Sequence, residues 1–144
     1  QIFNLPFIQV HPSGEMEEYR LKNGTVYLVL AIGEEAVDET RLSALTSRVA
    51  GILRLGKYDE PFPYMSERVM EALRVSGPLA IQNGSAYVLT EKGLRLYYAL
   101  LDLLYDVKGR EVVRKLREVR KADRKRKRRS GVRPVEASAT STTS

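Results

Sequence analysis

The chain contains no cysteine and no tryptophan, and His11 is its single histidine. Without cysteine there are no disulfides, thiolate zinc sites, iron–sulfur clusters or thiol nucleophiles, and one histidine supplies neither a His-based metal cage nor a catalytic triad. The sequence also lacks a glycine-rich phosphate loop. No serine has the general base and the orienting residue that would activate it as a nucleophile. We therefore expect no enzymatic activity, no cofactor and no metal, and interpret His11 as a loop residue.

Long hydrophobic segments are absent too. The longest uninterrupted apolar run, from Val26 to Ile32, is too short to cross a bilayer, and residues 1–30 show no signal-peptide pattern. The 144 residues, 43% of them hydrophobic, suffice for one domain with a buried core. The sequence thus predicts a soluble, cytoplasmic protein.

Positive charge is abundant at one end of the chain. Residues 1–107 hold 10 basic and 14 acidic side chains, whereas residues 108–144 hold 14 basic and 4 acidic ones. Such asymmetry favours a polyanion-binding extension, because clustered Lys and Arg release counterions from phosphates when they bind. A charged fraction of 29% with only six Asn and Gln residues is also typical of a thermophile.

The N-terminal region, residues 1–35, is predicted to be a β-hairpin extension. Short β-rich runs cover residues 7–10, 17–21 and 25–32. The Asn23-Gly24 pair between two of these runs is typical of a type I′ hairpin turn.

Helical periodicity begins in the following region, residues 36–107. Five apolar residues share one helical face, and the acidic residues at 34–39 suit a helix N-terminus; these apolar residues are Leu42, Leu45, Val49, Ile52 and Leu53. Residues 59–63 contain two prolines and cannot be regular helix, and residues 64–75 are helical again. Residues 79–89 then predict a β-hairpin whose turn contains Asn83-Gly84.

A third helix starts after Thr90, a suitable N-cap residue. Between Leu94 and Tyr105 apolar residues surround this helix almost completely, so we expect one face to pack on the domain and another on a second copy or a protein partner. Gly109 interrupts the pattern. Residues 110–129 are predicted to form a charged helix, and residues 135–144 a polar tail with nothing to bury.

The order helix, proline-rich connection, helix, hairpin, helix resembles the winged helix-turn-helix fold. The segment Ala86-Tyr87-Val88-Leu89-Thr90-Glu91-Lys92-Gly93 is similar to the strand-into-helix junction of archaeal and bacterial regulators of the MarR and PadR type. The resemblance covers roughly residues 38–107 and implies a winged-helix domain there. With the regions on either side, we expect an α+β fold: a winged-helix domain with an N-terminal β extension and a basic C-terminal helix and tail.

The resemblance also implies DNA contacts from the helix at 66–75 and from the hairpin tip. By position, these would come from Ser66, Arg68, Arg74, Asn83 and Ser85. The sequence departs from the family pattern because Glu67 and Glu71 offset the two arginines, and because the hairpin tip contains no Lys or Arg. Whether this helix reads bases or is scaffold therefore stays open.

The basic segment, residues 108–134, carries the stronger indication of function. We predict that its cations contact nucleic-acid phosphates, and they are Arg114, Lys115, Arg117, Arg120, Lys121, Arg124, Lys125, Arg126, Lys127, Arg128, Arg129 and Arg133. From residue 120 to residue 129 the only acidic side chain is Asp123, whereas a solvated helix face would mix charges of both signs. No aromatic residue accompanies these cations, so base stacking on single strands is not expected.

The most consistent interpretation is a non-catalytic nucleic-acid-binding protein, a DNA-binding regulator or chromatin-type protein whose basic tail contacts phosphates. One alternative is a structural RNA-binding protein of the ribosome or another large nucleoprotein assembly. A second alternative is a protein adaptor that docks through the helix at 94–105. The sequence alone does not decide between DNA and RNA.

Overall fold

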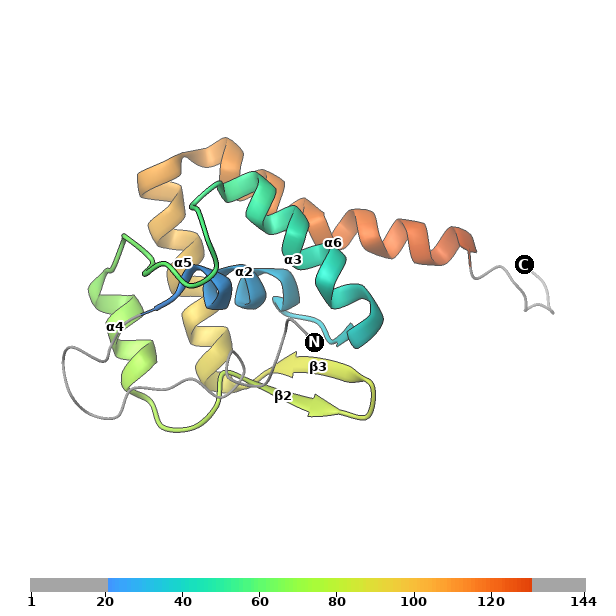
Figure 1. The fold of residues 1–144 in the computed structure, drawn as a ribbon, viewed down its shortest axis with the longest axis horizontal. Helices are drawn as coiled ribbons and strands as arrows, with labels where there is room; N and C mark the ends of the chain where they lie inside the picture. The colour runs from blue at the N-terminus through green and yellow to red at the C-terminus, as the bar shows by residue number, and fades with distance from the viewer. Residues whose placement is uncertain (1–20, 131–144) are drawn as a thin grey trace.

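The structure is a computed structural model that describes residues 21–130, with side chains described as far as Asp123. Within this range the chain forms an α+β domain of five helices and one three-stranded sheet (Figure 1). The elements are α2 (Asn23–Ile32), β1 (Val37–Asp38), α3 (Glu39–Leu53), α4 (Glu67–Arg74), β2 (Ala80–Asn83), β3 (Ala86–Leu89), α5 (Glu91–Lys108) and α6 (Arg110–Ser130).

The sheet is antiparallel, with strand order β1-β3-β2. Asn83 pairs with Ala86, so the hairpin between β2 and β3 has a two-residue loop, Gly84-Ser85. Gly84 has φ +66°, which glycine adopts without steric cost. The predicted hairpin is thus confirmed, as are the helices that precede and follow it.

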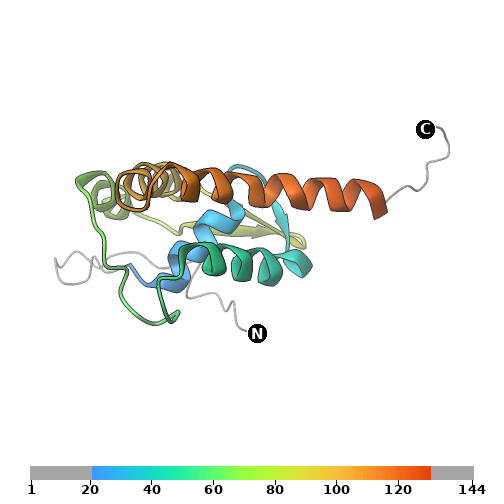
Figure 2. The same ribbon diagram turned by 90° about the horizontal axis from the view of Figure 1, so that it is seen from above.

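The prediction for residues 25–32 was wrong: they form helix α2 rather than a strand, and Asn23-Gly24 begins this helix instead of turning a hairpin. Every residue from Asn23 to Ile32 is buried, because α3, α5, α6 and β3 all contact this helix. Figure 2 shows α2 between α3 and α6. A helix buried on all sides has no polar face, so its sequence shows no 3.6-residue period and resembles a buried strand.

The N-terminus of α2 is capped by the connection between α3 and α4, residues 54–66. The backbone amide of Asn23 donates to the carbonyl of Glu60, and that of Gly24 to the carbonyl of Tyr58, both at 2.9 Å. The Tyr27 hydroxyl donates to the carbonyl of Gly56 at 3.2 Å. The first two contacts satisfy backbone amides that a helix leaves without intrahelical partners. All three contacts fix the connection against α2.

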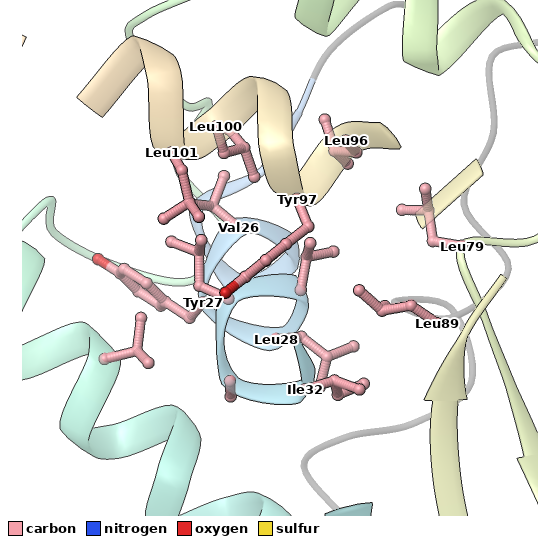
Figure 3. Packing of buried hydrophobic residues seen from close by; sticks show 14 of the residues in the cluster. Val26, Tyr27, Leu28, Ile32, Leu79, Leu89, Leu96, Tyr97, Leu100 and Leu101 are labelled. Carbon is pink, nitrogen blue, oxygen red and sulfur yellow. The ribbon is translucent and has the colours of Figure 1, made fainter. Parts of the chain in front are cut away.

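Helix α5 packs against α2 in the centre of the hydrophobic core (Figure 3). Leu96 and Leu100 of α5 are fully buried, and Leu101 lies close to Val26 of α2 (Figure 3). Helix α6 closes the core on another side with a predicted apolar stripe, of which Val119 is fully buried. The first half of α6 is therefore part of the domain.

Most of the apolar surface of α5 is buried by other elements of the same chain. Helices α2, α4 and α6 each contact α5, and most of its leucines are buried in the core. Tyr98, Tyr105 and Val107 remain exposed, at 40%, 52% and 41%. The partner on this helix stays a prediction, and the apolar surface left for it is smaller than expected, because most of the other apolar residues already have intramolecular contacts.

Several predictions concern residues outside the described range. These are the strand at 7–10, the strand at 17–21 except for its last residue, the loop residue His11, and the tail beyond Ser130. Leu21 itself is buried and belongs to no strand. Among residues 21–130 no helix combines the length and apolar character needed to cross a membrane.

Candidate nucleic-acid interface

Helix α6 begins directly after Gly109, whose φ of +103° allows the chain to turn sharply at the end of α5. Its 21 residues correspond to about 31 Å of helix at 1.5 Å per residue. In Figures 1 and 2 its C-terminal part extends beyond the rest of the domain. The predicted charged helix is confirmed, and it forms an arm anchored at one end.

Four exposed cations follow one edge of this helix, and we call them the basic row: Arg110, Arg114, Arg117 and Lys121. Their spacing of four, three and four positions places them on one face. The row covers about 16 Å along the helix axis. Positions 124 and 128 continue the same register in the helical backbone, so the sequence carries basic residues at the next two places as well.

Arg114 is the one member of the basic row that the structure ties to acidic residues. It donates to Glu111 and, at 2.8 Å, to Glu118. The hydrogen bond from Arg114 lowers the pKa of the Glu111 carboxyl. Arg110, Arg117, Lys121 and the neighbouring Lys115 are exposed. Arg114 therefore offsets one of the two negative charges, and the other is outnumbered by the remaining exposed cations, Arg110, Lys115, Arg117 and Lys121.

Arg120, which sequence patterns group with the phosphate-binding cations, lies on the inner side of α6. Its guanidinium donates to the carbonyls of Ile32, Glu35 and Ala36 at 2.7, 2.9 and 2.9 Å. Only 15% of the side chain is exposed. Because these carbonyls lie at and just beyond the C-terminus of α2, the positive charge also faces the negative end of that helix dipole. The geometry gives Arg120 a structural role.

A second charged contact joins α6 to α3. Arg41 donates to Asp123 through two nitrogens, each at 2.9 Å, and only 9% of the Asp123 side chain is exposed. The single acidic residue in the most basic part of the sequence is thereby neutralised by a partner outside α6. The contact also fixes α6 one turn before its projecting part.

The two cations on α4 are both engaged with carboxylates. Arg68 forms an ion pair with Asp102 of α5, and Arg74 forms one with Glu67 at 3.2 Å. Ser66, the third predicted contact residue here, caps α4 by accepting from the Val69 amide at 3.3 Å. The helix that the winged-helix resemblance assigns to base contacts thus presents little uncompensated positive charge.

The tip of the β2–β3 hairpin lies beside acidic side chains. The Ser85 hydroxyl donates to Asp38, and the Gln82 amide donates to Glu39, both at 3.2 Å. Asn83, the other predicted contact residue, is exposed at the end of β2. A phosphate approaching this tip would meet negative charge.

The motif that carries the family resemblance fixes the base of this hairpin. The Thr90 hydroxyl caps α5 by accepting from the Gly93 amide at 3.1 Å, and it donates to the carbonyl of Pro78 at 2.7 Å. Lys92 is only 2% exposed and donates to the carbonyl of Gly77 at 3.1 Å. A Cβ added at Gly93 would lie 2.1 Å from the carbonyl oxygen of Leu79. The motif therefore has a structural function: it joins α5 to the segment that enters β2.

Sequence reasoning missed Arg48 of α3. This exposed cation lines a hollow on the seam between α3 and α6, together with Glu118, Lys121 and Ala122. The contact between α3 and α6 joins residues about 70 positions apart, which no local pattern reveals. The predicted cations from Arg124 to Arg129 lie on helical backbone whose side chains are outside the described set, and Arg133 lies outside the described residues.

Within the described part of the chain, no group of three or more His, Asp or Glu side chains is arranged to hold a metal ion. Comparison with protein-family models, with curated proteins and with solved structures found no match in any of the three. The proposals that follow therefore depend on the residues and contacts described above.

Proposed function

We propose that this protein is a non-catalytic, nucleic-acid-binding protein of the winged-helix type that binds duplex DNA through its phosphates. The order of elements supports the fold assignment: α2, β1, α3, α4, β2 and β3 follow in the helix–strand–helix–helix–strand–strand order of a winged helix. The strand order β1-β3-β2, with the hairpin directly after α4, agrees with it.

The observation that carries the functional proposal is the distribution of uncompensated charge. The cations of α4 are paired with carboxylates, and the hairpin tip adjoins Asp38 and Glu39. On α6, by contrast, the basic row is exposed and runs into a further basic segment of the sequence. Positive charge along a helix edge attracts phosphates without reading bases. The proposal is thus closer to a chromatin-type protein than to a sequence-reading regulator.

The experiment that tests this proposal measures the salt dependence of binding to a duplex of random sequence. A variant that ends at Asp123 lacks seven cations, Arg124, Lys125, Arg126, Lys127, Arg128, Arg129 and Arg133. If most of them contact phosphates, the slope of log K against log salt should fall in magnitude by about 4–6 units, at about 0.9 per contact.

The shortened chain keeps the apolar stripe of α6 and Asp123, so its thermal unfolding should match that of the parent. Arg68→Gln, in the full chain, is the matched test of α4: we expect it to leave both affinity and salt slope nearly unchanged. A loss of about tenfold or more in preference for one duplex sequence with Arg68→Gln would instead identify α4 as a base-reading helix. Equal slopes for the parent and the shortened chain would refute phosphate binding by the cations after Asp123.

A further inference from the structure

We infer that the seam between α3 and α6 contains a phosphate-binding subsite, in which Arg48 and Lys121 together hold one backbone phosphate of the bound nucleic acid. This inference rests on the proposed function and extends it to a second helix. The site is a hollow of about 270 Å³ lined by Arg48 of α3 and by Glu118, Lys121 and Ala122 of α6. A hollow of this size has room for a phosphate group.

The charge balance around the hollow favours an anion. Glu118 already accepts a hydrogen bond from Arg114 at 2.8 Å, and Asp123, less than two turns further along α6, is paired with Arg41 at 2.9 Å. Arg48 and Lys121 are both exposed, and neither forms a hydrogen bond or ion pair with another residue of the described part of the chain. Two cations from different helices therefore face one hollow, against the single carboxylate of Glu118, which shares Arg114 with Glu111. A phosphate oxyanion would satisfy both.

The surface beside Arg48 is open enough for a polymer to reach the hollow. On the exposed side of α3, the residues four before and three after Arg48 are Ala44 and Gly51, and both are exposed. A Cβ built at Gly51 would meet no atom within 4 Å, so the surface of α3 is free there. No long side chain at these two positions separates the hollow from solvent.

The subsite also continues a line of positive charge. Lys121 is the last described member of the basic row, and it borders the hollow. Arg48 therefore adds a contact on a second helix to the row on α6. A backbone held between two helices is fixed in position and direction, whereas one helix edge alone lets it slide. The seam lies away from α4, which is at the left of the domain in both views, with α3 further to the right (Figures 1 and 2).

The test uses the full chain and a duplex DNA of random sequence, with binding measured over a range of salt concentrations. Arg48→Gln and Lys121→Gln should each weaken binding and lower the salt slope by about 0.9, and the double variant by about 2. Arg48→Lys retains the charge and should retain the slope. The matched control is Arg95→Gln, which removes the same charge from an α5 arginine paired with Glu91 at 2.9 Å; it should leave the slope unchanged.

The outcomes separate the subsite from the function as a whole. If Arg48→Gln behaves like Arg95→Gln while the chain ending at Asp123 binds more weakly, the subsite is refuted and the proposed function stands. If the parent binds no duplex at low salt, both are refuted. Inorganic phosphate is the probe for a free anion: if it competes at matched ionic strength far better than chloride, the site holds free phosphate and the assignment to a polynucleotide is overturned. All these side chains are exposed, so the variants should unfold at the temperature of the parent.

Discussion

Arg117 and Arg120 are three positions apart on the same helix, yet the structure predicts opposite consequences for their removal. Arg120 donates to three carbonyls around the C-terminus of α2, of which the bond to Ile32 is partly buried. Arg117 is exposed and belongs to the basic row. We therefore expect Arg120→Ala to affect stability and Arg117→Ala to affect binding.

The expected cost of Arg120→Ala follows from its contacts. A hydrogen bond from a charged donor contributes about 1.5–3 kcal/mol when shielded, and less in contact with water. With one partly buried and two exposed bonds, and with the favourable helix dipole, the loss should be about 2–4 kcal/mol in the free energy of unfolding. In a domain of this size that corresponds to a decrease in Tm on the order of 10 °C. Arg117→Ala should change stability by about 0.5 kcal/mol or less, because exposed substitutions away from caps and networks are nearly neutral.

The assay combines urea unfolding followed by circular dichroism with duplex binding over a range of salt. Arg117→Ala should lower the salt slope by about 0.9. Arg120→Ala, measured well below its Tm, should leave the slope unchanged. The opposite result, a stable Arg120→Ala variant with a reduced salt slope, would show that the guanidinium contacts phosphate rather than the carbonyls of α2 and would refute the structural role.

Three further substitutions test other parts of the structure. Gly51→Ala should stabilise the protein by about 0.5–1 kcal/mol in urea unfolding, because the new Cβ meets no atom within 4 Å and alanine favours helix; a decrease would contradict this. Gly93→Ala should cost about 1–3 kcal/mol in the same assay, since its Cβ would lie 2.1 Å from the carbonyl oxygen of Leu79; parental stability would show that the junction yields easily. Burial lowers the pKa of Lys92 from its ordinary value of 10.5. Between that lowered pKa and 10.5 the unfolded chain binds more protons, so stability should rise with pH in the parent relative to Lys92→Met; parallel pH profiles would refute this.

The elements that were predictable from the sequence are those with one solvent-exposed face, because polar residues then recur at regular spacing. Helices α3 and α5 show the expected apolar period, Thr90 is the expected cap, and Gly84 allows the expected hairpin turn. Helix α2 was mistaken for a strand because burial on every side removes the polar residues that reveal helical spacing. For α5 the sequence predicted apolar residues almost all round; the chain itself buries most of them, whereas Tyr98, Tyr105 and Val107 stay exposed.

The candidate interface was only partly predictable, for a related reason. Composition identifies a basic segment, but it cannot separate Arg120, which faces α2, from Arg117, which faces solvent. That distinction depends on how α6 is rotated against the core, and the rotation is set by contacts with residues far away in the sequence, such as Arg41 and Asp123. The sequence around Arg48 does not mark it as a binding residue, since one arginine on a helix is usually a solvated side chain. Only the packing of α3 against α6 makes it a candidate.

The connection between α3 and α4 has a mechanical consequence. Its carbonyls at Tyr58 and Glu60 cap the buried helix α2, so the angle between α3 and α4 cannot change without exposing the amides of Asn23 and Gly24. The connection therefore restricts the movement of α4 relative to α3. The domain should therefore meet its ligand as a rigid body.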